Sequence, residues 1–130
     1  MTEQRWTTDE LDRIGGADEL RLAPRRKDST LRRAVPIWVV RVGDELYVRS
    51  FRGESGRWYR AAQTTGEGHA SAGGINKDVV LLAAGGEIDD AVDAAFREKY
   101  GRYTGYVEPM LARQARATTL RLVPRAEAGA

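Results

Sequence analysis

Hydrophobic residues are concentrated in two neighbouring runs, 35–42 and 46–52, which the polar triplet Gly43-Asp44-Glu45 separates. Glycine and aspartate tolerate the backbone conformations that tight turns require, so the two runs are predicted to form a β-hairpin. The first run is almost wholly apolar, which is typical of a strand that is covered on both faces. We therefore expect residues 35–42 to form the central strand of the domain.

Four further segments carry a strand pattern. Residues 19–23 alternate apolar and polar positions and lead through a turn at 28–30 into the central strand. Residues 67–74 and 75–84 are predicted to form a second hairpin around paired glycines, and residues 118–124 a last strand. Six strands in hairpins predict a mostly β domain with flanking helices, arranged as a small antiparallel barrel.

Two segments are predicted to be helices of defined role. Thr7 and Glu10 have the spacing of a capping box, so residues 1–18 are expected to contain a helix that caps one end of the barrel. Over residues 87–100, apolar residues recur on one helical face, so this helix is expected to pack across the sheet. Shorter pieces are a single turn over 57–63, a loop over 102–106, a short helix over 109–116 and a frayed tail over 125–130.

Length and composition exclude several classes of protein. The 130 residues suffice for one domain, 1–130, with its own core. The absence of cysteine excludes disulfides and thiolate ligands and is typical of a cytoplasmic protein. No apolar stretch approaches the ~20 residues of a membrane helix, and the first residues lack a signal-peptide pattern. We expect a soluble, cytoplasmic protein with no membrane partner.

Metal-dependent and triad-based hydrolysis are poorly supported. His69 is the only histidine, so neither a catalytic triad nor a histidine-rich zinc site can be assembled from this chain. We expect His69 to be a surface residue of a strand. Asp89, Asp90 and Asp93 are explained by their favourable interaction with a helix N-terminus. No metal is predicted, and no catalytic residue is assigned.

Positive charge is concentrated in one part of the chain. Residues 21–60 carry eleven basic and four acidic side chains, whereas the whole chain has a net charge of only +2. An anionic partner would be steered toward the hairpins in this segment. Solvated strand faces in an arginine-rich chain are the alternative explanation for any single arginine.

Candidate binding residues cluster directly after the second run. The segment Gly53-Glu54-Ser55-Gly56 is a glycine-containing turn whose backbone N–H groups are exposed, and hydroxyl and guanidinium donors surround it: Ser50, Arg52, Ser55 and Arg57. Such an arrangement suits a phosphate, which arginine binds bidentately. Trp58 and Tyr59 follow and can stack on a ring, although Trp58 is equally well explained as a core residue beneath the barrel end. The cluster predicts a site for an anionic, planar small molecule.

Over nearly its whole length, the chain resembles a bacterial family of uncharacterised proteins that is known by a domain-of-unknown-function label. Five segments carry the resemblance: Trp6-Thr7-Thr8-Asp9-Glu10-Leu11, Ile37-Trp38-Val39-Val40-Arg41, Tyr47-Val48-Arg49-Ser50, Lys99-Tyr100-Gly101-Arg102-Tyr103 and Ala117-Thr118-Thr119-Leu120-Arg121-Leu122. Membership in such a family implies no activity.

Residues 33–60 and 96–103 also resemble, more distantly, the deazaflavin-dependent nitroreductases of the flavin-binding split-barrel superfamily. The resemblance rests on Pro36, Ser50, Gly53, Gly56, Trp58 and Tyr59, in that order. It implies a six-stranded split barrel, a homodimer, and FMN or a deazaflavin as cofactor. The phosphate or acidic tail would bind Arg25, Arg33, Ser50, Arg52, Gly53, Ser55 and Arg57. The ring would bind Trp38, Trp58 and Tyr59, and the substrate Tyr103 and Tyr106.

Two alternatives stay open. The chain has Gly56-Arg57 where those enzymes have His-Pro, and Arg60-Ala61 where they have Asn-Leu, which favours a split barrel that has lost its cofactor and acts as an interaction protein. A basic barrel that binds single-stranded nucleic acid is the other alternative, motivated by the charge of residues 21–60. The near-neutral remainder of the chain argues against nucleic acid.

Overall fold

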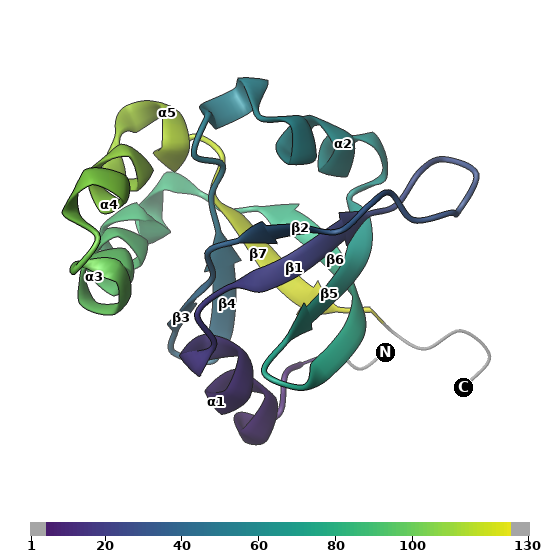
Figure 1. Cartoon of the computed structure of the whole chain (residues 1–130), viewed down its shortest axis with the longest axis horizontal. Helices are drawn as coiled ribbons and strands as arrows, with labels where there is room; N and C mark the ends of the chain where they lie inside the picture. The colour runs from purple at the N-terminus through teal and green to yellow at the C-terminus, as the bar shows by residue number, and fades with distance from the viewer. Residues whose placement is uncertain (1–4, 126–130) are drawn as a thin grey trace.

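The computed structural model describes residues 5–125. Within these residues, a single antiparallel sheet of seven strands curls around the centre, with helices at its margins (Figure 1). The strand order is β2-β1-β5-β6-β7-β4-β3. The strands are β1 (Leu20–Pro24), β2 (Val35–Ile37), β3 (Val40–Val42), β4 (Glu45–Val48), β5 (Glu67–Ala72), β6 (Ile75–Ala83) and β7 (Leu120–Pro124). The predicted class, a mostly β barrel with flanking helices, is confirmed.

The apolar run 35–42 forms two strands, β2 and β3, which lie at opposite ends of the sheet order. Strand β2 pairs with β1, whereas β3 pairs with β4. Side chains alternate across the junction: Ile37 and Val39 pack inside the curled sheet, while Trp38 and Val40 pack against the outer helices. The predicted coverage of both faces is therefore confirmed, but the prediction that this run forms the central strand is wrong, because β2 and β3 are the two edge strands of the sheet. The sheet has seven strands instead of six because this one run serves both edges.

The predicted hairpins are present. Strands β5 and β6 pair around Gly73-Gly74, whose φ angles of 57° and 84° explain why glycine occupies both turn positions. Strands β3 and β4 pair around Gly43-Asp44, with Val42 opposite Glu45. The second apolar run is shorter as a strand than predicted, because β4 ends at Val48 and the chain then turns away from the sheet.

Helix α1 (Thr8–Gly16) begins with the predicted capping box, in which Thr7 and Glu10 exchange hydrogen bonds of 3.1 and 2.9 Å. It packs against β3, β4 and β6 and closes one end of the barrel. Trp6 is buried beside it, and its indole Nε1 donates to the Leu122 carbonyl at 2.9 Å. The predicted capping segment and the predicted tail both extend beyond the described residues, at 1–4 and 126–130.

Helix α3 (Asp89–Tyr100) follows the short 3₁₀ helix η2 (Gly86–Ile88) and packs on β3 as expected. Two predictions for the other helices are wrong. Helix α2 (Arg57–Thr65) is longer than a single turn, and residues 102–106 are not a loop, because α4 (Thr104–Leu111) begins within them. Helix α5 (Arg113–Arg116) completes the chain of elements before β7. Among residues 5–125, no helix has the length and apolar character needed to cross a bilayer.

Candidate functional site

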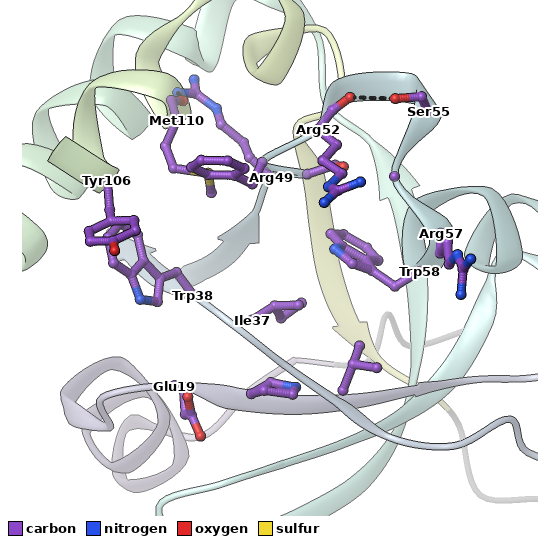
Figure 2. A pocket seen from close by; sticks show the side chains of 15 residues that line it. Glu19, Ile37, Trp38, Arg49, Arg52, Ser55, Arg57, Trp58, Tyr106 and Met110 are labelled. Carbon is purple, nitrogen blue, oxygen red and sulfur yellow. Dashed lines mark hydrogen bonds between the residues drawn. The ribbon is translucent and has the colours of Figure 1, made fainter.

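A cavity of about 790 Å³ opens between β2, α4 and the segment that joins β4 to α2 (Figure 2). Strand β2 and Trp38 form one wall, and residues 49–52 and 55–58 form the opposite wall. Tyr106 and Met110 contribute from α4, and Glu19 completes the lining just before β1. A volume of this size lies within the range of about 300–1,000 Å³ that is usual for ligand pockets.

One corner of the cavity combines a helix N-terminus with an unpartnered hydroxyl. Gly56 is the N-cap of α2 and offers no side chain to the first N–H groups of the helix. Ser50 Oγ lies against this glycine, since a Cβ on Gly56 would be 2.2 Å from it. This oxygen is buried and has no hydrogen-bond partner within residues 5–125. The Ser50 hydroxyl and the first N–H groups of α2 are therefore the donors from which a ligand oxyanion at this corner could accept hydrogen bonds.

Two exposed arginines flank the same corner. Arg52 and Arg57 line the cavity, and neither forms an ion pair within the described part of the chain. Figure 2 shows both guanidinium groups on the Trp58 side of the cavity, away from Glu19. Ser55 Oγ also lies at the cavity but donates its hydrogen to the Arg52 carbonyl at 2.9 Å. The arginines are available to bind a phosphate bidentately.

Gly53 serves the turn and not the cavity. It opens the 3₁₀ helix η1 (Gly53–Ser55) with a φ of 66°, a conformation that strongly favours glycine. It is buried, and a Cβ there would come within 3.2 Å of the Gln114 side chain and backbone. Close packing of η1 against α5 thus explains the residue.

Two tryptophans line the cavity from different elements. Trp38 stacks on Tyr100 with the ring centres 4.0 Å apart and the planes 4° from parallel. Trp58, in the first turn of α2, contacts Tyr59 edge-on at 6.0 Å and also packs against the barrel core. Both interpretations of Trp58 are therefore compatible with its position, because one side is core and the other lines the cavity. These rings provide apolar walls for a planar ligand.

Arg49 lines the cavity but is committed to the fold. Its side chain is fully buried, and Nε donates to Thr119 Oγ1 at 2.8 Å. Nη1 donates to Asp93 Oδ1 at 2.5 Å and to the Met110 carbonyl at 3.0 Å, which ties α3 and α4 to the end of β4. Arg49 is therefore assigned to the stability of the fold and not to ligand binding. Removing one partner of such a buried ion pair would leave an uncompensated charge.

Several predicted site residues lie outside the cavity. Arg25 is held across the sheet by Asp78 at 3.1 Å and by the Ser29 carbonyl at 2.7 Å, so its charge is already compensated. Arg33 is exposed in the connection between β1 and β2 and does not line the cavity. Tyr59 faces the barrel core beside Trp58. The structure therefore brings together Trp38, Ser50, Arg52, Ser55, Arg57, Trp58 and Tyr106, and it leaves out Arg25, Arg33, Gly53, Tyr59 and Tyr103.

The structure adds lining residues that the sequence did not single out. These are Glu19, Val35, Ile37, Arg49, Phe51 and Met110. Glu19 reaches the cavity because β1 pairs with β2, and Met110 because α4 packs on α3. Neither of these long-range contacts can be recognised from the residues next to Glu19 or Met110 in the sequence. Arg49 stood out in the sequence only as part of the segment 47–50 that carries the family resemblance, with no sign of its burial.

Beneath Trp38, burial changes the acidity of two neighbouring residues. Desolvation lowers the pKa of Lys99 to about 8, with Asp18 opposing the shift, while its Nζ donates to the Val39 carbonyl at 2.6 Å. Burial raises the pKa of the Tyr100 hydroxyl to about 12. That hydroxyl donates to the carbonyls of Asp18 and Val39, at 3.0 and 3.2 Å. Both residues fix the backbone at the junction of β2 and β3.

Acidic and histidine side chains do not gather as metal ligands anywhere in residues 5–125. Asp89 and Asp93 face Arg49, and Asp90 pairs with Arg116 at 2.9 Å. His69 lies on β5, as predicted, with Nδ1 2.9 Å from Asp78 Oδ1. The three aspartates of α3 therefore take part in ion pairs of the fold.

Three solved structures share the fold at low sequence identity. A FAD-binding protein from Mesorhizobium loti is 15% identical, with 97% of this chain and 95% of that chain covered and a TM-score of 0.57. An F420 reductase is 16% identical, with coverage of 89% and 93% and a TM-score of 0.53. A FAD and heme binding protein from Mycobacterium smegmatis is 18% identical, with coverage of 93% and 67% and a TM-score of 0.53. These likenesses confirm the split-barrel fold.

No protein with curated annotation matches the sequence. A family match covers residues 10–122, which include strands β1 to β6, the first three residues of β7 and the whole lining of the cavity. The chain belongs to the family described as uncharacterized proteins conserved in bacteria, DUF2255.

Proposed function

We propose that this protein binds a flavin or deazaflavin cofactor in the cavity between β2, α2 and α4 and acts as a redox protein. The observation that carries the proposal is the corner where the unpartnered Ser50 hydroxyl meets the open N-terminus of α2, between Arg52 and Arg57. Fold relatives whose names state F420 or FAD support the choice of cofactor class. Such a cofactor supplies hydride transfer when bound, and the protein contributes binding and orientation.

The residues present fit both halves of such a ligand. A phosphate at the α2 corner would accept hydrogen bonds from Ser50 and from the first N–H groups of the helix, and it would pair with Arg52 and Arg57. Apolar walls for a ring come from Trp38, Trp58 and the side chains of β2. No side chain is assigned as an acid, base or nucleophile, because the lining needs none for binding and orientation.

The test is a titration of the purified protein with FMN and with a deazaflavin cofactor, followed by absorbance and fluorescence. We expect Arg52→Ala combined with Arg57→Ala to weaken binding by well over tenfold, because two charge-assisted contacts of about 1.5–3 kcal/mol are lost. The matched control is Arg32→Ala combined with Arg33→Ala, which removes the same charge from exposed residues outside the cavity. Equal affinity in both double variants would remove the phosphate site from this corner.

We propose a homodimer as the assembled form, in keeping with the split-barrel resemblance. Phe51 and Tyr106 line the cavity and are 47% and 65% exposed, so a second copy that covers them would also shield the ligand. Sedimentation velocity at rising concentration distinguishes a dimer from a monomer. Phe51→Glu is expected to shift the distribution toward the monomer.

A cofactor-free role remains the alternative outcome of the titration. Failure of both cofactors to bind, in protein whose fold is verified by circular dichroism, would favour a split barrel that interacts with other proteins. Salt-sensitive binding of an oligonucleotide by the same preparation would instead favour the nucleic-acid alternative.

A further inference from the structure

A second, smaller cavity of about 240 Å³ adjoins the first and shares Glu19, Trp38 and Tyr106 with it. Asp18, Tyr100, Arg102 and Tyr103 complete its lining. In Figure 2, Glu19, Trp38 and Tyr106 lie on one side of the main cavity, whereas Arg52 and Arg57 lie on the other. A molecule seated here would therefore lie next to a ring bound in the main cavity, at the end away from its phosphate.

Aromatic rings dominate this second cavity. Trp38 is stacked on Tyr100, and the Tyr103 ring lies 6.0 Å from Trp38 at an angle of 34°. Tyr103 and Tyr106 are 42% and 65% exposed, so their rings are accessible. Aromatic faces carry partial negative charge and attract cations, most strongly when several rings surround the same point.

The charged residues of the cavity add to this preference. Asp18 and Glu19 supply two exposed carboxylates, and the Glu19 carboxylate has no hydrogen bond or ion pair within the described chain. The opposing charge in the lining is Arg102, whose side chain is 65% exposed, while the partly buried Lys99 also lies near Asp18. The Arg102 guanidinium carbon lies 4.8 Å from the centre of the Tyr103 ring, and Nη2 lies 3.9 Å from Asp18 Oδ1. An exposed cation of the chain itself thus lies on an aromatic face beside a carboxylate, where a ligand cation would bind.

We propose that this second cavity binds the cationic group of the substrate, a protonated or quaternary amine, which displaces Arg102 from Tyr103. The assignment as a substrate group rests on the proposed cofactor site next door, whereas the affinity for a cation rests only on the residues named here. The substrate class is therefore an amine-bearing molecule that reaches the main cavity past Trp38.

Two probes of similar shape and opposite charge test this inference: phenyltrimethylammonium and benzenesulfonate. Each is titrated into the protein without cofactor, and the tyrosine ring signals are followed by NMR, with Tyr103, which lines the second cavity but not the first, assigned through Tyr103→Phe. We expect the ammonium probe to shift the Tyr103 signals at millimolar concentration and the sulfonate to leave them unchanged. Binding of the sulfonate alone, or of neither probe, would overturn the inference.

Two variants sharpen the test because they predict opposite directions. Glu19→Gln is expected to weaken binding of the ammonium probe by about two- to fivefold, while Arg102→Gln is expected to strengthen it by about the same factor, because an internal competitor is removed. Glu54→Gln is the control, since this exposed carboxylate lines neither cavity. Weaker binding in Arg102→Gln would contradict displacement of that residue.

Repeating the titration with and without FMN separates the two proposals. If FMN binds and the ammonium probe does not, the second cavity loses its assignment and the cofactor site stands. If the ammonium probe binds and no cofactor does, the cation site stands and the redox function falls.

Discussion

Lys99 shows how a single side chain can make stability depend on pH. Its side chain is partly buried beneath the β2–β3 junction, where the amino group donates to the Val39 carbonyl and lies 4.9 Å from the Tyr100 ring centre. Desolvation disfavours the charged form, so the pKa falls from 10.5 to about 8 in the folded protein. The unfolded chain therefore binds more protons than the folded chain between these two pH values.

This difference has a defined sign. Because stability rises with pH wherever the unfolded state binds more protons, the contribution of Lys99 is expected to become more favourable as pH increases from about 8 toward 10.5. The free energy of unfolding, measured in urea at several pH values, should therefore rise in the wild type relative to Lys99→Met. Measurements stay below the pH at which tyrosine ionises in the unfolded chain, because the raised pKa of Tyr100 has the opposite effect. Parallel curves for the two proteins would show that Lys99 is not desolvated.

At the scale of elements, the start of α2 determines the geometry of the cavity corner that contains Ser50 and Gly56. Gly56 has φ and ψ of −60° and 135°, which any residue can adopt, so backbone strain does not explain the glycine. Space explains it, because Ser50 Oγ occupies the position next to a potential Cβ. The hydroxyl and the glycine that begins α2 are thus mutually dependent, because a residue with a Cβ at position 56 would leave no room for the Ser50 hydroxyl.

A double-mutant cycle tests this dependence. Gly56→Ala is expected to lower the free energy of unfolding by about 1–3 kcal/mol through overpacking, and Ser50→Ala in the same chain is expected to restore about 1 kcal/mol of it. Urea denaturation of the four proteins gives the coupling. Gly105→Ala in α4 is the control, since a Cβ there meets nothing within 4 Å. Additive effects of the two substitutions would indicate that the Ser50 hydroxyl simply rotates away.

The elements also show where sequence information is sufficient. The capping box of α1 and the glycine pair between β5 and β6 are local signals, and both predictions are confirmed. Helix α4 was missed because it contains Gly105 and Pro109, which disfavour helix interiors, and packing of Val107 and Met110 against α3 holds it together. The division of run 35–42 was also invisible, since the choice of partner strand depends on residues far away in the chain.

The candidate site shows the same difference between local and long-range sequence information. Ser50, Arg52, Arg57 and Trp58 are close in sequence, so a local pattern predicted that they act together. Arg25 also fitted the pattern of charge, but its position opposite Asp78 follows from the pairing of β1 with β5 and of β5 with β6. Long-range pairing therefore decides which arginines are free, and the sequence alone does not reveal it.

At the scale of the whole molecule, the barrel is open along one seam. Strands β2 and β3 end the sheet order and are not hydrogen-bonded to each other, although Trp38 and Val39 join them covalently. The central strands β5, β6 and β7 have partners on both sides. The candidate cofactor cavity lies against β2, so the ligand site is placed at an edge of the sheet.

Hydrogen exchange should report this arrangement. Amides of β6 and β7 are expected to exchange most slowly, because they are paired on both sides, and those of the connection 26–33 most rapidly. Addition of FMN is expected to slow exchange in residues 35–38 and 50–58, which line the cavity, and to leave β5 unaffected. Mass spectrometry of peptides resolves these segments. Uniform slowing across the whole sheet would instead indicate general stabilisation without a ligand at the seam.

From Ile37 to Val40, side chains alternate between the two faces of the sheet without interruption. This alternation limits where residues can be inserted into the chain. One residue inserted there would exchange the two faces downstream, turning Val40 and Val42 toward the barrel interior and Arg41 toward the helices. The exposed connection 26–33, by contrast, can gain or lose residues without altering either face. We therefore expect insertions and deletions among family members to fall in that connection, and the short segment that links the two edges of the sheet to keep its length.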